Sequence, residues 1–473
     1  MKRIVALFSG LLIFLSGCTI PLSRPDQVAS SPLIFTLPQI EHVTLSNGIR
    51  LYFKEDHELP LVNVTVMAPG GEIMDPAEKV GLNTLLAKSL RTAGAGSRSA
   101  DQIDRQVEQM AADFSVSADT YALTLDLSLL ASDLPAGLDL LQDVLQQPVF
   151  DPERIELSRR QMVEAIRRQN DHPQAIGSRV LQREIYGDHP LGSTPTEATV
   201  QAITRDDLLA AYNETLSPER LWFAVSGDFD RTKLIAALEA RFSSWSQRTE
   251  IQRKLPPVNV TGDGNAIFVQ KELPQSVVML GQVGVDKNAP DLHAVRVMNF
   301  ILGGGGFNSR MMKEIREERG LAYSVYSYFQ VGRLLPGAFI AQCETKSSTT
   351  IEALELMLAA MEKIRNQPVS SEELQVAKES INNSFVFSFT TPHDVVTQAL
   401  RLDFYGYPQG YLETYRQQVE ALTVADIQMA ARVHLQPEKM SIVLVGNEQG
   451  VGTPLPQLSH SWQRRSVSEN QGK

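Results

Sequence analysis

The 473-residue sequence has few cysteines, an excess of acidic over basic residues, and no apolar run beyond its N-terminus long enough to cross a membrane. Its two cysteines, Cys18 and Cys343, exclude a disulfide framework and a cysteine-rich zinc module. The net charge of −11 argues against a protein that binds nucleic acid or anionic membranes. A hydrophobic content of 43% without periodic glycine or proline excludes disordered and collagen-like chains, and the length predicts more than one globular domain.

The N-terminal segment has the features of a signal peptide. Two basic residues precede an apolar run over residues 5–15, which is shorter than the roughly 20 residues that span a bilayer. The run ends in Leu-Ser-Gly-Cys, which resembles the bacterial lipobox, so we expect removal of residues 1–17 and lipidation of Cys18. Residues 18–37 would then be a tether. Thr19, in place of an aspartate that signals inner-membrane retention, favours the periplasmic face of the outer membrane.

The rest of the sequence repeats itself at a constant offset. Residues 203–208 (ITRDDL) align with residues 422–427 (LTVADI), and Tyr186 aligns with Tyr405 without any change of offset. A constant offset between segments so far apart indicates two similar domains of about 200 residues each, not a short solenoid repeat. The expected divisions are a first domain at 38–245, a linker at 246–262, a second domain at 263–452 and a polar tail at 453–473.

Apolar periodicity predicts strands and helices in alternating groups. Period-two alternation predicts strands, and apolar residues spaced three or four apart predict helices, one of them with Ser99 as its N-cap. Strand pairs followed by helix pairs predict an α+β class and not a doubly wound parallel sheet. The predicted strands are 49–53, 61–66, 121–127, 221–225 and 441–445, and the predicted helices are 98–113, 135–146 and 152–168.

Three short motifs carry a family resemblance. They are Leu-Ser-Asn-Gly at 45–48, Pro-Gly-Gly at 69–71 followed by Gly81, and Arg-Glu-Glu-Arg-Gly-Leu-Ala-Tyr at 316–323. On these residues the chain resembles the pitrilysin/insulinase family of zinc peptidases, the inverzincins, from about residue 43 to residue 446. The resemblance implies two homologous domains, each a mixed and mostly antiparallel sheet covered by helices, that face each other across a cleft.

The zinc motif of catalytic members is missing. H-x-x-E-H places two zinc-binding histidines on one helical face and a glutamate that activates water between them. The resemblance aligns Asn83 and Ala87 with the histidines, Leu86 with the glutamate and Glu164 with the distal ligand. Alanine and leucine offer neither ligand nor base, and Glu164 is interpreted as a surface charge beside two arginines. None of the eight histidines has another four residues away, so we expect no catalytic site and no metal in this chain alone.

Arg316 and Tyr323 match a pair that, in catalytic members, reaches from the C-terminal domain toward the zinc site. A tyrosine hydroxyl can donate to a developing oxyanion, and an arginine can hold substrate carbonyls. In two-chain members one subunit supplies the zinc motif and its partner supplies this pair, and the present chain resembles that partner. The alternative is an exposed arginine paired with Glu317 or Glu318, together with a core tyrosine.

The glycine run Gly303-Gly304-Gly305-Gly306 lacks the lysine and the strand context of a phosphate-binding loop. Non-catalytic subunits of mitochondrial processing peptidase have a similar glycine-rich loop that faces substrate, which implies a mobile loop here. A structural turn before the next helix explains the run equally well.

These observations predict a lipid-anchored periplasmic protein that is the non-catalytic subunit of a two-chain peptidase. Its partner would be a homologous chain that carries H-x-x-E-H and zinc, and its substrate would be peptides. The alternative is a catalytically silent peptide-binding or envelope scaffold protein, which would have no reason to keep Arg316 and Tyr323. A zinc peptidase with an unrecognised site is a third possibility.

Overall fold

The structure is a computed structural model. It describes residues 35–246, 254–259, 264–452, 454–455 and 461–466. The chain divides into a short N-terminal unit, Met1–Thr36, and a large unit, Leu37–Lys473, to which every element below belongs. The predicted signal peptide and Cys18 lie outside the described residues. Within the described part of the chain, none of the helices has both the length and the hydropathy of a membrane-spanning helix.

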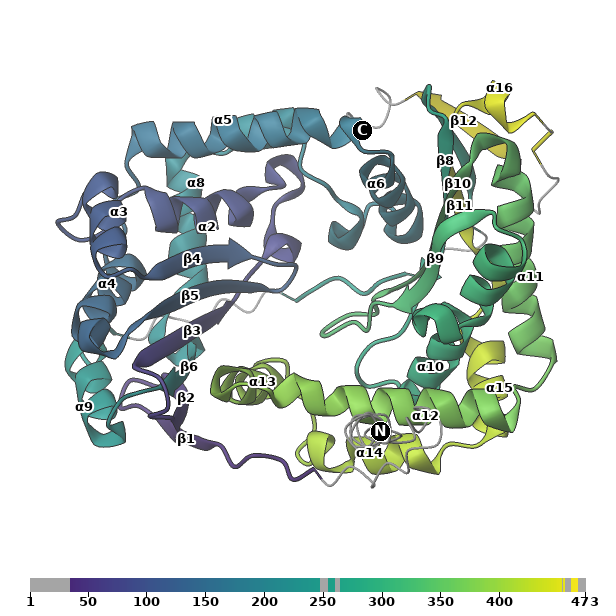
Figure 1. Cartoon of the computed structure of the whole chain (residues 1–473). Coiled ribbons are helices and arrows are strands. Elements are labelled where there is room, and N and C mark those ends of the chain that lie inside the picture. The colour runs from purple at the N-terminus through teal and green to yellow at the C-terminus, as the bar shows by residue number, and fades with distance from the viewer. Residues whose placement is uncertain (1–34, 247–253, 260–263, 453, 456–460, 467–473) are drawn as a thin grey trace, which may run out of the picture. The chain divides into compact units, whose positions relative to one another are not determined.

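Two six-stranded sheets that share the order of five of their strands form the frame of the large unit, and the sixth strand is β1 in the first sheet and β12 in the second (Figure 1). The first has the order β1-β2-β6-β3-β5-β4 and the second the order β12-β7-β11-β8-β10-β9. The predicted α+β fold with two similar domains is confirmed. The strands are β1 (Glu41–Thr44), β2 (Arg50–Glu55), β3 (Leu61–Pro69), β4 (Asp113–Ala118), β5 (Ala122–Leu130), β6 (Trp222–Gly227), β7 (Ala266–Gln270), β8 (Gln275–Val283), β9 (Ala322–Phe329), β10 (Ala338–Lys346), β11 (Ser441–Gly446) and β12 (Trp462–Ser466).

The last long strand of each repeat lies in the middle of its sheet. β6 runs parallel to β2 on one side and antiparallel to β3 on the other, and β11 has the same two relations to β7 and β8. Both strands are almost entirely buried. An apolar strand without polar alternation is typical of a strand that is covered on both faces. The sequence predicted both strands but not their central position.

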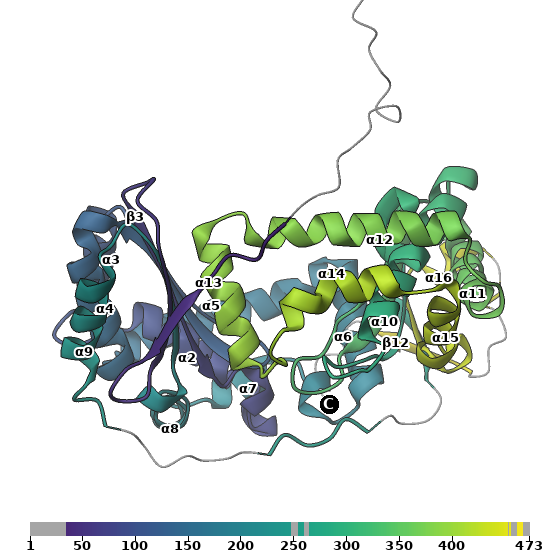
Figure 2. The ribbon, with the colours of Figure 1, turned by 90° about the horizontal axis from the view of Figure 1, so that it is seen from below.

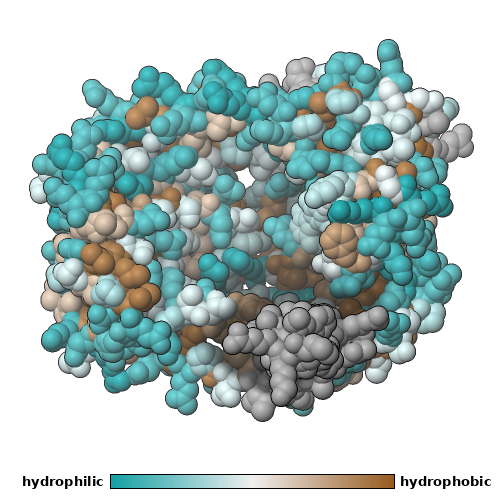
Figure 3. Space-filling view, in the orientation of Figure 1, coloured by the Kyte–Doolittle hydropathy of each residue, from teal (hydrophilic) through white to brown (hydrophobic). Residues whose placement is uncertain are grey.

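Helices of the same repeat cover one face of each sheet and complete two large apolar cores. On the face seen in Figure 3, the outer surface is mostly hydrophilic, and hydrophobic side chains gather in the hollow between the sheets. The helices are α2 (Leu82–Thr92), α3 (Ala100–Gln109), α4 (Leu134–Gln146), α5 (Pro152–Arg168), α6 (Pro173–Tyr186), α7 (Glu197–Ala202), α8 (Arg205–Thr215), α9 (Arg231–Phe242), α10 (Leu292–Asn299), α11 (Thr350–Asn366), α12 (Ser371–Val386), α13 (Pro392–Phe404), α14 (Tyr411–Ala421), α15 (Val424–His434) and α16 (Glu448–Val451).

The repeat extends to the way in which equivalent helices begin. In α8 the Thr204 hydroxyl accepts from the backbone nitrogen of Asp207 at 3.2 Å, and the Asp207 carboxylate accepts from the backbone nitrogen of Thr204 at 2.8 Å. Thr423 and Asp426 make the same two bonds at the start of α15, at 3.3 and 2.8 Å. These capping boxes satisfy backbone donors that the first helical turn leaves unpaired. The offset seen in the sequence is therefore a structural repeat.

The second face of each sheet is covered by a helix from the other repeat (Figure 1). α6 packs on β8 and β11, with Ile176 and Val180 in the apolar cluster. α13, which holds the equivalent position in the second repeat, packs on β6 and β2, with Val396 and Leu400 beside Met67. Each of these two helices thus packs on the sheet of the other repeat and not on the sheet of its own repeat. This exchange joins the two repeats into one unit.

Candidate functional site

A buried aspartate organises the start of α2, the helix on which the zinc motif would lie. Asp75 accepts hydrogen bonds from the backbone nitrogens of Gly81 and Asn83, at 2.7 and 2.9 Å, and from the Asn83 side-chain amide at 2.8 Å. The backbone bonds satisfy donors of the first turn. Burial raises the pKa of the Asp75 carboxyl to about 6, against the opposing effect of these hydrogen bonds. Asn83 is therefore a structural partner of Asp75.

The residues that the resemblance aligned with two zinc ligands and the catalytic base lie against the core. Asn83, Leu86 and Ala87 are 3%, 0% and 2% exposed. The ligands of a catalytic zinc ion must instead point toward a position that stays open to water or substrate. The pair four residues apart on the less buried face of α2 is Thr84 and Lys88. The phase of the helix therefore favours Thr84 and Lys88, one residue further along, as the positions equivalent to the two histidines.

The shift of one residue leaves the motif incomplete. The position of the glutamate base then falls on Ala87, and the Thr84 hydroxyl donates to a carboxylate oxygen of Glu72 at 2.9 Å. Glu164 lies exposed on α5 and forms an ion pair with Arg168 at 2.8 Å, which fits the interpretation as a surface charge. Among the residues that the structure describes, no three His, Cys, Asp or Glu side chains are grouped so as to hold a metal ion.

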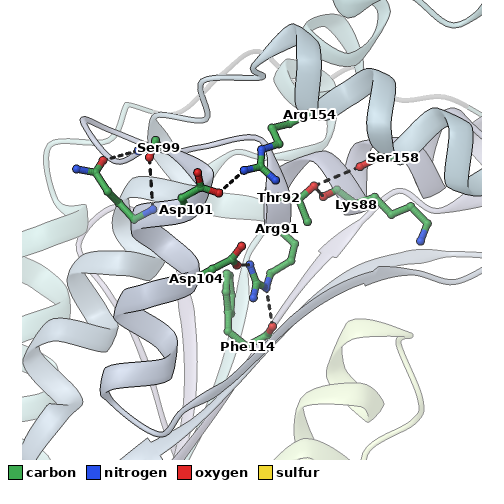
Figure 4. A network of polar contacts seen from close by, with 10 residues as sticks. Lys88, Arg91, Thr92, Ser99, Asp101, Asp104, Phe114, Arg154 and Ser158 are labelled. Atoms are coloured by element: carbon green, nitrogen blue, oxygen red, sulfur yellow. Dashed lines mark hydrogen bonds and ion pairs between the residues drawn. The ribbon is translucent and has the colours of Figure 1, made fainter.

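Polar contacts tie the end of α2 to its neighbours (Figure 4). The Arg91 guanidinium donates to the carbonyl oxygen of Phe114 on β4 and to Asp104 on α3, both at 2.8 Å. The hydroxyls of Thr92 and Ser158, on α2 and α5, lie 3.3 Å apart. α2 is thus held by three elements, and these contacts fix which of its residues face the core.

Arg316 and Tyr323 form an exposed stack with Phe307. The guanidinium carbon of Arg316 lies 4.6 Å from the ring centroid of Tyr323 and 4.8 Å from that of Phe307. Tyr323 is 82% exposed and Phe307 is 62% exposed. Cation–π contacts at exposed sites stabilise by about 0.5–1 kcal/mol each. The two rings therefore orient the guanidinium on the surface of the second domain.

This geometry differs from the structural alternative that the sequence left open. Tyr323 is not a core residue, and within the described residues Arg316 forms no ion pair with Glu317, Glu318 or any other carboxylate. Phe307 was not predicted from the sequence as part of this site. The available signal was an aromatic residue placed directly after the four glycines.

The helical turn that carries Arg316, Met312–Glu318, is anchored at both ends. Before it, the Arg310 guanidinium donates two hydrogen bonds to the Glu373 carboxylate of α12, at 2.6 and 2.8 Å, and they lower the pKa of Glu373 to about 2. After it, Gly320 adopts a φ of 64° and donates its backbone N–H to the Arg316 carbonyl at 3.0 Å. A left-handed glycine at this point lets the chain turn directly into β9.

The four glycines at 303–306 lie in and between two short helical segments, and Gly303 packs against Ser327 of β9. A Cβ atom at Gly303 would lie 2.4 Å from the Ser327 hydroxyl oxygen and 2.6 Å from the Ser327 backbone nitrogen. Gly306 has a φ of 56°, which other residues rarely adopt. Close packing and backbone conformation therefore account for glycine at these two positions without a substrate contact.

Comparison with known families gives two consecutive matches. The family model described as Insulinase (Peptidase family M16) matches residues 50–199, and the model described as Peptidase M16 inactive domain matches residues 202–381. The "Non-peptidase homolog YmxG" of Helicobacter pylori is 23% identical over 407 residues, which are 85% of this chain and 92% of that protein. The "Uncharacterized zinc protease ML0855" of Mycobacterium leprae is 28% identical over 332 residues, which are 68% and 72% of the two chains.

Solved structures share the fold over most of the chain. A peptidase M16 inactive domain from Pseudomonas fluorescens has a TM-score of 0.77 and 27% identity, and the match covers 87% of this chain and 98% of that one. A protease from Helicobacter pylori has a TM-score of 0.78 at 20% identity, with 87% and 100% covered. A chain of complex III2 from Candida albicans has a TM-score of 0.72 at 16% identity, with 86% and 96% covered. At such low identity, the last two show the fold alone.

Proposed function

Because this chain belongs to peptidase family M16 and lacks the H-x-x-E-H motif, we propose that it is the non-catalytic subunit of a two-chain peptidase. It lends Arg316 and Tyr323 to a homologous partner that carries H-x-x-E-H. The partner holds the zinc ion, which supplies the activated water when bound. The substrates are peptides, and the chain alone is inactive.

The exposed stack of Phe307, Arg316 and Tyr323 is the observation that carries this proposal. Two aromatic residues that served only the fold would be expected to bury most of their surface, and neighbouring exposed aromatic side chains are typical of an interaction site. Here the tyrosine ring is 82% exposed, and the guanidinium lies between two rings with no carboxylate partner in the described part of the chain. The guanidinium can donate to substrate carbonyl oxygens, and the hydroxyl can donate to the oxyanion that forms on the scissile carbonyl.

The named relatives are consistent with a division into silent and catalytic chains. One is called a non-peptidase homolog and another a zinc protease, and both cover most of this chain at low identity. A partner with the same two-domain fold would present its open α2 face to peptides, with histidines at the positions of Thr84 and Lys88. The first-domain helix of the present chain offers an alanine at the position of the base.

The proposal includes lipid anchoring at the periplasmic face of the outer membrane. Its support is the Leu-Ser-Gly-Cys sequence that ends at Cys18, after a charged and then apolar segment. Cys18→Ser should move the protein from the membrane fraction to the soluble fraction, or leave an unprocessed precursor, in a cell-fractionation experiment. Unchanged processing and membrane retention would contradict the anchor.

Purification of the tagged full chain from the envelope of its host tests the proposal. We expect a homologous H-x-x-E-H chain to co-purify, and we expect the pair, but not this chain alone, to cleave a fluorogenic peptide. Arg316→Ala should assemble and lose activity. The matched control Arg319→Ala removes a nearby exposed arginine that pairs with Glu352, and it should stay active. Cleavage by the isolated wild-type chain would overturn the proposal, and full activity of the assembled Arg316→Ala complex would favour the scaffold alternative.

A further inference from the structure

A cavity of about 630 Å³ opens among α10, α12, α13, α14 and the edge strand β9. Figure 2 shows α12 and α14 running side by side, with α13 beyond their ends. None of the three residues of the exposed stack lines this cavity. Its volume lies within the range of about 300–1,000 Å³ that is usual for ligand pockets. It is therefore a candidate binding site separate from Arg316 and Tyr323.

The lining of the cavity is cationic, although the chain as a whole carries a net charge of −11. Three arginines line it, Arg296 from α10, Arg333 from the β9–β10 connection and Arg401 from α13. No aspartate or glutamate is among its lining residues. Guanidinium groups gathered from three elements without a counter-charge in the wall favour an anionic ligand.

The three arginines differ in how far the protein itself satisfies them. Arg333 donates to the Tyr405 hydroxyl at 2.6 Å and lies 3.5 Å from the Asp119 carboxylate. Arg296 lies over the Tyr415 ring, with its guanidinium carbon 5.3 Å from the centroid. The Arg401 guanidinium has no hydrogen-bond or ion-pair partner within the described residues. Arg401 is therefore the arginine most available to a ligand.

Aromatic side chains form the rest of the wall. Phe385 and Tyr415 stack with centroids 4.9 Å apart and ring planes 12° apart, and Phe389 packs on Phe385 at 5.2 Å. Ser384 and Gln398 add polar groups to the lining. A bare inorganic anion would leave the aromatic surface uncovered. A ligand that combines an anionic group with an apolar body and amide groups matches all three parts of the wall.

We propose that this cavity binds the carboxylate of a peptide, either its C-terminus or an acidic side chain, with an adjacent apolar residue on the aromatic wall. Arg401 supplies a guanidinium fork that can form two parallel hydrogen bonds with a carboxylate. The choice of a peptide as ligand rests on the proposed function. The binding itself requires neither the partner chain nor catalysis, so the two proposals can fail separately.

Isothermal titration calorimetry with the purified full chain alone tests the inference. The probes are acetyl-Ala-Ala-Ala-Ala-Phe with a free carboxylate, the same peptide as its C-terminal amide, and an amidated peptide with glutamate before the phenylalanine. The first and third peptides distinguish the two sources of the carboxylate, and binding of either supports the site. We expect the neutral amide to bind at least about tenfold more weakly than the better of them.

Two variants locate the site. Arg401→Ala should weaken binding of the carboxylate peptide about tenfold or more, and Arg401→Lys should restore part of it, because lysine keeps the charge but not the fork. Arg168→Ala removes an exposed arginine outside the cavity and should leave binding unchanged. Equal affinity for acid and amide peptides, an unaffected Arg401→Ala chain, or displacement by inorganic phosphate at the affinity of the peptide would overturn the inference.

Discussion

Tyr323→Phe should slow peptide cleavage by the two-chain complex about 10²–10³-fold in kcat, because it removes one donor to the oxyanion. The substitution keeps the ring that lies 4.6 Å from the Arg316 guanidinium, so the stack is preserved. Tyr323 is 82% exposed, and within the described residues its hydroxyl has no hydrogen-bond partner. The free energy of unfolding of the chain should therefore change by less than about 0.5 kcal/mol.

Loss of an oxyanion donor raises the activation free energy by about 2.7–4 kcal/mol. The expected effect of the substitution on catalysis is therefore much larger than its effect on the free energy of unfolding. The assay mixes the variant with its H-x-x-E-H partner, confirms assembly by gel filtration and measures turnover of a fluorogenic peptide. Tyr326→Phe is the matched control. Tyr326 lies three residues after Tyr323 on β9, its ring stacks on that of Tyr328, and the substitution likewise deletes only a hydroxyl. Full activity of an assembled Tyr323→Phe complex would refute the reasoning.

Two further substitutions test the framework of the domains. Glu373→Gln should lower the free energy of unfolding at pH 7 by about 1–3 kcal/mol, because it leaves the largely buried Arg310 guanidinium without its bidentate partner. Because the pKa of Glu373 is lowered to about 2, the ion pair stabilises the fold fully above pH 4.5, and this stabilisation is lost as the pH falls through 2. Urea unfolding at pH 7 measures the difference, and equal stability of wild type and variant would contradict the prediction. Asp75→Asn should remove a pH dependence of opposite sign. Burial raises the pKa of Asp75 to about 6, so the free energy of unfolding of the wild type falls by up to about 3 kcal/mol as the pH rises from 3.8 through 6. Thermal unfolding of wild type and variant at pH 4.5 and 7.5 checks this, and a stability difference that does not change with pH would speak against it.

Local features of the fold could be read from the sequence because short-range chemistry determines them. The Ser99 cap predicted a helix start, and the structure shows the capping box there. The repeated Thr204 and Thr423 begin equivalent helices with equivalent bonds. The helix predicted at 152–168 has the same bounds as α5. Caps, prolines and apolar periodicity act within one or two turns, so a single sequence contains their signals.

Features that depend on tertiary packing could not be read in this way. α6 and α13 were not among the helices predicted from the sequence, and the packing of each on the sheet of the other repeat joins residues far apart in the chain. The same holds for the phase of α2, which is fixed by Asp75 and by contacts with three other elements. The position on α2 that is equivalent to the first zinc-binding histidine therefore depends on this packing, which favours Thr84 over Asn83.

Measuring zinc in each of the two separated chains tests the central claim most directly. The complex is purified, its chains are separated under native conditions, and the metal content of each is determined by mass spectrometry together with peptidase activity before and after recombination. The proposal predicts about one zinc ion in the H-x-x-E-H chain, none at stoichiometric level in the present chain, and activity only when the two are combined. About one tightly bound zinc ion in the present chain, lost together with peptide cleavage on Glu164→Ala, would contradict it.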